Sequence, residues 1–153
     1  MRKLNIAYGN SCFAKTWANK QITFDELRER LKTTIRTSET VAEYPKLSKE
    51  ERNKIKDKGG FVGGLLKDNR RKAANVVSRS MLSLDVDSAK VGFIEDFCEK
   101  FDKAFCLYST HRHTKDAPRV RIVIPLTRDV TSDEYTAITR YLANEWDIDQ
   151  FDE

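Results

Sequence analysis

Asp85 and Asp87 close an apolar run of the sequence that begins at Met81. Side chains of a strand alternate between its two faces, so residues two positions apart point to the same side. Carboxylate oxygens are the ligands that Mg²⁺ and Mn²⁺ prefer in proteins. The spacing makes this strand end a candidate site for one or two divalent cations. A turn or a helix cap is the alternative interpretation of the same pattern.

Both histidines of the chain, His111 and His113, lie in one polar stretch between two apolar runs. Imidazole, hydroxyl and guanidinium groups all bind phosphate oxygens, so the stretch predicts contacts with a nucleotide or another phosphate. The candidate phosphate-binding residues are Ser109, His111, His113, Arg119 and Arg121. A polar hairpin loop has a similar composition, and either arginine could equally be the ion-pair partner of a carboxylate.

Positive charge is concentrated in residues 46–79, which hold eleven Lys or Arg and four Asp or Glu, whereas the formal charge of the whole chain is only +4. A basic stretch beside an acidic remainder favours a phosphate-bearing partner such as single-stranded DNA. A solvated helix face followed by a charged loop is the alternative. The residues predicted to bind DNA are Lys67, Arg70, Arg71, Lys72 and Arg79.

Three Ser/Thr-x-x-Glu capping boxes predict helices that begin after Thr23, Ser48 and Thr131. The first helix is expected to extend as far as Ile35, and the apolar spacing predicts a fourth helix over residues 91–102. Apolar runs and alternations predict strands over residues 60–66, 76–86, 104–109 and 119–126.

From residue 76 onward the expected order is strand, helix, strand, strand, helix, which is typical of a ferredoxin-like or RNA-recognition-motif-like unit. Its closing strand should follow Trp146, where only residues 147–153 remain. We therefore expect an α+β fold that lacks its last strand, in a fragment or a naturally shortened relative. One domain is expected over 1–153, with a basic N-terminal α/β part over 1–75 and the sheet unit over 76–153.

The composition excludes several classes of protein. An apolar content of 39% with 34% charged residues is typical of a globular protein and not of a disordered tail. No apolar run approaches the roughly 20 residues of a spanning helix and no signal peptide begins the sequence, so a cytoplasmic location without membrane contact is expected. The three cysteines form no Cys-x-x-Cys pair. A zinc site would need Cys98, Cys106, His111 and His113, whose spacing matches none of the usual templates.

Taken together, these residues resemble the archaeo-eukaryotic primase superfamily, and in particular the N-terminal catalytic domain of phage and plasmid primase-polymerases. Asp85-Val86-Asp87 resembles the first motif of that superfamily and Ser109-Thr110-His111 its Ser-x-His second motif. Phe151-Asp152 resembles the third motif, a carboxylate after a hydrophobic residue. Such enzymes also tend to show the Pro-Arg-x-Arg seen at 118–121 and the Gly-Gly-Phe-Val-Gly-Gly seen at 59–64. The resemblance spans nearly the whole chain.

The resemblance implies a metal-dependent nucleotidyltransferase, a DNA primase and DNA polymerase that copies single-stranded DNA in phage or plasmid DNA replication. It implies that Asp85, Asp87 and Asp152 hold two Mg²⁺ or Mn²⁺ ions and that His111 contacts the phosphates of a nucleoside triphosphate. Asp149 competes with Asp152 for the third carboxylate, because both follow a hydrophobic residue. A helicase module or protein downstream is an implied partner. Activity of this chain alone is expected to be weak, because Asp152 is its penultimate residue.

Two other functions remain open. A shortened primase-like domain can serve as a nucleic-acid or protein binder, for instance a phage interference factor, without strong catalysis. A rolling-circle nicking endonuclease would use His111-Arg112-His113 as a His-x-His metal pair and Tyr135 or Tyr141 as its nucleophile. That second interpretation leaves the two aspartates of the apolar run without a role.

Overall fold

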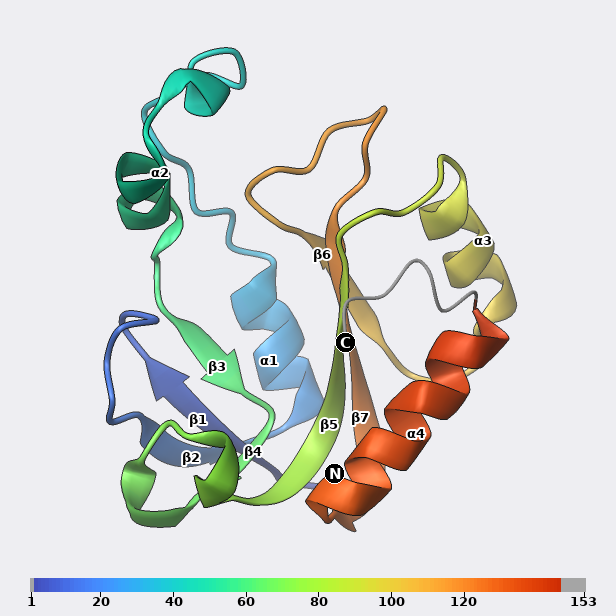
Figure 1. The fold of residues 1–153 in the computed structure, drawn as a ribbon. Helices are drawn as coiled ribbons and strands as arrows, with labels where there is room; N and C mark the ends of the chain where they lie inside the picture. The colour runs from blue at the N-terminus through green and yellow to red at the C-terminus, as the bar shows by residue number, and fades with distance from the viewer. Residues whose placement is uncertain (1, 147–153) are drawn as a thin grey trace.

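Residues 2–146 are described by the computed structural model, in which seven strands form two antiparallel sheets (Figure 1). The strand order is β2-β1-β3 in the smaller sheet and β4-β5-β7-β6 in the larger one. The strands are β1 (Leu4–Gly9), β2 (Ala18–Ile22), β3 (Gly60–Val62), β4 (Gly64–Leu66), β5 (Val76–Val86), β6 (Cys106–Ser109) and β7 (Val120–Val130). The α-helices are α1 (Phe24–Leu31), α2 (Lys49–Lys56), α3 (Phe93–Lys100) and α4 (Ser132–Glu145). The expected α+β class is confirmed.

The larger sheet contains the segment that was expected to form an RNA-recognition-motif-like unit. From Val76 onward the elements follow the expected order β5, α3, β6, β7 and α4. Both β5 and β6 pair with β7 in antiparallel fashion, so the ends of β5 and β6 lie beside the start of β7 (Figure 1). β4 pairs with the first residues of β5 at its other edge. The place expected for a closing strand, after Trp146, lies outside the described residues.

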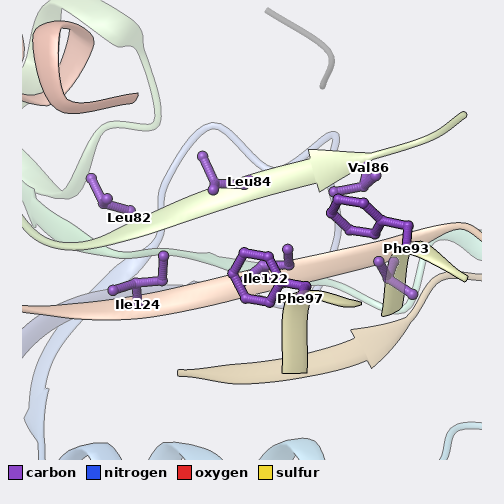
Figure 2. Packing of buried hydrophobic residues seen from close by; sticks show 8 residues of the cluster. Leu82, Leu84, Val86, Phe93, Phe97, Ile122 and Ile124 are labelled. Atoms are coloured by element: carbon purple, nitrogen blue, oxygen red, sulfur yellow. The ribbon is translucent and has the colours of Figure 1, made fainter. Parts of the chain in front are cut away.

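The face of the larger sheet toward α3 and α4 carries the main hydrophobic core (Figure 2). Alternate residues in the last part of β5 and the first part of β7 contribute to it, because the pleat sends alternate side chains to the same face. These residues are Leu82, Leu84 and Val86 of β5 and Val120, Ile122 and Ile124 of β7. Phe93 and Phe97 of α3 pack against them. The same alternation places Asp85 and Arg121 on the opposite face of the sheet.

That opposite face is covered in part by α1 and β1. Met81 and Val123 of the larger sheet pack there against Ile6 of β1 and Leu27 of α1. Residues from both halves of the chain therefore share one core. The expected extension of the first helix to Ile35 is wrong, because α1 ends at Leu31 and Ile35 is exposed. Residues 33–35 are all β-branched, which lowers their helix propensity.

The remaining local predictions are confirmed with small shifts. In all three capping boxes the Ser or Thr side chain accepts from the backbone N–H of the Glu, and the Glu side chain accepts from the N-cap backbone. The fourth helix occupies 93–100 within the expected 91–102, and β5 matches its expected range.

No helix among residues 2–146 has the length and apolar character to cross a membrane.

The strand expected over 60–66 is divided at Gly63 between the two sheets. β3 pairs with β1, whereas β4 pairs with β5. The Gly63 carbonyl accepts a hydrogen bond from the Ser80 N–H at 2.9 Å, and a Cβ on Gly63 would lie 2.2 Å from Met81 Cγ. A glycine is needed here because the chain crosses so closely over β5. β1 and β2 have no counterpart among the expected strands. β2 is largely polar and, among the strands of residues 2–146, pairs only with β1.

Candidate functional site

Polar side chains form a row across the larger sheet close to the end of β5. Asp85 of β5 lies opposite Arg121 of β7, and Arg121 lies opposite Tyr108 of β6. The Arg121 guanidinium donates to both carboxylate oxygens of Asp85, through Nε to one and through Nη2 at 2.8 Å to the other. A bidentate pair of this kind fixes the orientation of both groups as well as neutralising their charges.

A second ion pair lies at the same end of the sheet, between Arg119 Nη2 and the carboxylate of Asp87. The four side chains of the two pairs are 24–43% exposed, so both pairs are accessible to a ligand. Two carboxylates at one strand end repel each other unless positive charge neutralises them. Arg119 and Arg121 supply that charge. Of the two roles that the sequence allowed for these arginines, the structure shows the ion pair with a carboxylate.

The side chains at this site provide oxygen atoms of the kind that divalent cations bind. Asp85 and Asp87 offer carboxylate oxygens at the same end of the strand, which suits Mg²⁺ or Mn²⁺, and the guanidinium groups are the competing partners. Residues 2–146 contain no group of three or more His, Cys, Asp or Glu side chains placed to hold a metal, which argues against the zinc set. The third carboxylate, Asp152 or Asp149, lies outside the described residues.

Burial shapes the ionisation of the groups beside the ion pairs. Burial is the largest influence on the pKa of Arg121 and lowers it, but the hydrogen bond and charge of Asp85 and the interaction with Tyr108 together raise that pKa above its ordinary value. Burial raises the pKa of Tyr108. It also raises the pKa of Cys106 to about 11, so this cysteine stays a thiol at neutral pH and is a poor nucleophile or metal ligand.

His113 helps to close the loop of residues 110–119 between β6 and β7. Its Nδ1 accepts a hydrogen bond from the Arg119 backbone N–H at 3.2 Å, and the backbone N–H of His113 donates to the Thr110 carbonyl at 3.0 Å. The Thr110 N–H in turn donates to the Arg119 carbonyl at 3.0 Å. His113 thus fixes the backbone of the residue whose side chain pairs with Asp87.

His111 makes a different contact, with the segment between α1 and α2. Its Nε2 lies 3.0 Å from Glu39 Oε1, and its ring meets the ring of Tyr44 edge-on at 4.6 Å between centroids. The Glu39 side chain is only 10% exposed, and Tyr44 is buried. The Thr37 hydroxyl donates to Glu39 Oε1 at 2.6 Å, and this hydrogen bond is the main cause that lowers the pKa of Glu39.

Glu39 and Tyr44 were missed by the reasoning from sequence. No motif marks them, and nothing local shows that residues 37–46 reach the loop after β6. One signal was present: Thr40-x-x-Glu43 repeats the pattern of the three capping boxes, and its reciprocal hydrogen bonds of 2.8 and 3.2 Å form. That pattern indicates an ordered turn in the segment, although not its partner.

Ser109 and the two proposed tyrosine nucleophiles do not join this site. Ser109 alternates with Tyr108 along β6 and so lies on the other face of the sheet. The Tyr135 hydroxyl contacts the Ser83 backbone at 3.3 and 3.4 Å, and Tyr141 is exposed on α4. The two histidines contact separate partners and not a common point, which disfavours the His-x-His metal pair.

The residues predicted to bind DNA do not form one patch. Lys67, Arg70 and Lys72 are exposed around the 3-10 turns Lys67–Asn69 and Ala73–Asn75, which lie far from α2 (Figure 1). Arg71 donates to the Cys12 carbonyl at 2.7 Å, with its guanidinium 4.7 Å from the Trp17 ring. Arg79 lies on β5 over the Tyr135 ring. These two arginines have structural partners.

The chain was compared with protein families, curated proteins and solved structures. The family model described as VapE N-terminal domain matches residues 1–153, the full length of the sequence. No curated protein and no solved structure matches the chain.

Proposed function

The chain belongs to the VapE N-terminal domain family, a family associated with phages and plasmids, and we propose that it is the nucleotidyltransferase domain of a DNA primase-polymerase. Its substrates in this proposal are nucleoside triphosphates, and its template is single-stranded DNA. The family context, a replication-associated protein of phages or plasmids, agrees with that role.

The observation that carries the proposal is that two carboxylates, two guanidinium groups and a histidine-bearing loop gather at one end of one sheet. A nucleotidyltransferase needs carboxylates for divalent cations and cationic groups for a triphosphate. Here the two sets neutralise each other. Partly exposed ion pairs contribute only about 0–1 kcal/mol each, so an exchange of partners costs little.

The proposed roles follow from this exchange. Asp85 and Asp87 hold Mg²⁺ or Mn²⁺, with Asp152 as the third carboxylate that the resemblance implies. A cation bound there supplies Lewis-acid stabilisation of the charge on the triphosphate and activates the primer 3′-hydroxyl. Arg119 and Arg121, released from the carboxylates, bind phosphate oxygens, and His111 adds a further hydrogen bond.

Primer extension tests the proposal. The chain is supplied with Mn²⁺, a primed single-stranded template and either deoxynucleoside or ribonucleoside triphosphates. We expect extension that Asp85→Asn abolishes. The matched control is Asp116→Asn, which changes an exposed carboxylate in the loop of residues 110–119 and should leave extension unchanged. Equal extension by the Asp85→Asn variant and the unchanged chain would remove Asp85 from the mechanism.

A nucleic-acid binder without strong catalysis is a second candidate, which the ion pairs themselves favour. Both aspartates already have arginine partners and need no metal to be neutralised. Calorimetry with Mn²⁺ separates the two candidates, because only the nucleotidyltransferase requires a cation at Asp85 and Asp87. DNA binding without cation binding and without extension would support the binder.

A further inference from the structure

Residues 37–46, between α1 and α2, form an ordered strap beside the loop that carries His111. The Thr40 and Glu43 side chains exchange hydrogen bonds with each other's backbone N–H, and the Tyr44 N–H donates to the Thr40 carbonyl at 3.1 Å. The Tyr44 side chain is buried. The strap is therefore held by its own contacts and presents Glu39 in a defined position.

Glu39 is bound on one oxygen only. Its Oε1 accepts from the Thr37 hydroxyl and lies 3.0 Å from His111 Nε2, whereas its Oε2 is buried without a hydrogen-bond partner in the described part of the chain. A largely buried carboxylate is costly unless donors or a positive charge satisfy it. His111, from the loop of residues 110–119, is the ring that lies beside this carboxylate.

The contact fixes which nitrogen of His111 remains for a ligand. Because Nε2 lies 3.0 Å from Glu39 Oε1, the other ring nitrogen, Nδ1, is the one left to meet a phosphate oxygen. An imidazole that donates from both nitrogens carries a positive charge, and the Glu39 carboxylate balances it. The edge-on contact with Tyr44, at an interplanar angle of 63°, limits rotation of the ring.

We propose that Glu39 is a positioning residue, which holds His111 with its Nδ1 directed to a triphosphate. This inference rests on the proposed function, because it takes the nucleoside triphosphate as the ligand of His111. It adds to the site a residue that no motif marks, contributed by a segment about seventy positions earlier in the chain.

Nitrogen-15 NMR of the imidazole rings tests the contact without any activity. The chain has only two histidines, so His113 is an internal reference. We expect a protonated, hydrogen-bonded Nε2 on His111 in the unchanged chain, and changed His111 nitrogen shifts with unchanged His113 shifts in Glu39→Gln. Glu50→Gln, an exposed change on α2 outside the strap, should leave both rings unchanged. Identical His111 shifts in Glu39→Gln and the unchanged chain would overturn the inference.

Calorimetry with a deoxynucleoside triphosphate and Mn²⁺ tests the role in binding. Loss of one hydrogen bond to a charged group predicts about tenfold weaker binding in Glu39→Gln. A residue that acts through His111 should lose its effect when His111 is absent, so His111→Ala and the double variant should bind equally. Additive losses would overturn the inference. Absence of triphosphate binding by the unchanged chain would overturn the proposed function and its ligand together, whereas equal binding by Glu39→Gln and the unchanged chain would overturn the inference alone.

Discussion

Asp85 and Arg121 face each other across β5 and β7, and Asp87 pairs with Arg119 at the same end of the sheet. Each residue type alone has several uses. Because they are paired, each of the four charged groups can bind a ligand only when the opposite group of its ion pair binds something else. A divalent cation and a triphosphate would therefore assist each other's binding, because each removes the competitor of the other.

Arg121→Gln tests this competition. We expect the variant to bind Mn²⁺ several-fold more tightly, because Asp85 loses its cationic partner, and to bind triphosphate more weakly. Stability should change by no more than about 1 kcal/mol, since the pair is partly exposed. Calorimetry with each ligand measures both effects. Arg112→Gln, at a neighbouring loop position without a role in the proposal, is the control. Unchanged Mn²⁺ affinity in Arg121→Gln would contradict the competition.

The residue-scale predictions from sequence succeeded where type and spacing are enough. Asp85 and Asp87 lie at the end of β5, each in an ion pair, and His111 and His113 lie in the loop of residues 110–119. The pairing of each aspartate with an arginine depends on the register between β5 and β7, which spacing along the chain does not reveal. The contact between His111 and Glu39 depends on how a distant segment folds back, so local patterns are silent about it.

At the scale of elements, helix starts were predictable because a capping box is satisfied within four residues. β2 was not, because a short polar strand is stabilised by its neighbours and not by its own sequence. β1 was also missed, although its Leu4 and Ile6 alternate with Asn5. The break at Gly63 was also not predictable from local sequence. Glycine is needed there because a side chain would collide with Met81, a residue of another strand.

The capping box of α4 predicts a pH effect on stability. Glu134 accepts hydrogen bonds from the Arg128 side chain and the Thr131 backbone, which lower its pKa from 4.5 to about 2. Because the folded-state pKa is depressed, the stabilisation is complete above about pH 4.5 and is lost as the pH falls toward 2. The Tm deficit of Glu134→Gln should therefore shrink over that range in thermal unfolding. Glu99→Gln, an exposed change on α3, should show no such trend. A constant deficit from pH 7 to 2.5 would contradict the assignment.

Gly64→Ala tests the close approach of β4 to β5. A Cβ at this position would lie 2.0 Å from the Ser78 backbone oxygen, which cannot move without disturbing the strand pairing. We expect a loss of about 1–3 kcal/mol in the free energy of unfolding, the range for overpacking. Gly60→Ala in β3 is the matched control, because its Cβ would meet only Trp17 Cη2 at 3.4 Å and should change stability by about 0.5 kcal/mol or less. Denaturant titration measures both, and equal losses would contradict the steric argument.

At the scale of the whole molecule, the basic residues divide into structural and exposed sets. Arg71 and Arg79 stack on aromatic rings, and Arg71 also holds the Cys12 carbonyl, so their removal would disturb the fold as well as any DNA contact. Lys67, Arg70 and Lys72 are exposed around the turns that precede β5. Only this second set reports cleanly on nucleic-acid binding.

Replacement of Lys67, Arg70 and Lys72 by Ala should weaken single-stranded DNA binding equally for all sequences, because contacts to phosphate carry no sequence information. Each phosphate contact with a single strand contributes about 0.7 to the slope of log affinity against log salt concentration, so the triple variant should lose up to about 2 units of slope. Fluorescence anisotropy of a labelled oligonucleotide over a salt series measures the slope. The matched control replaces Lys100, Lys103 and Arg140, which have the same total charge and lie on or next to α3 and on α4. If both triple variants reduce the slope equally, net charge alone attracts DNA. If only the first does, the turns before β5 contact the strand.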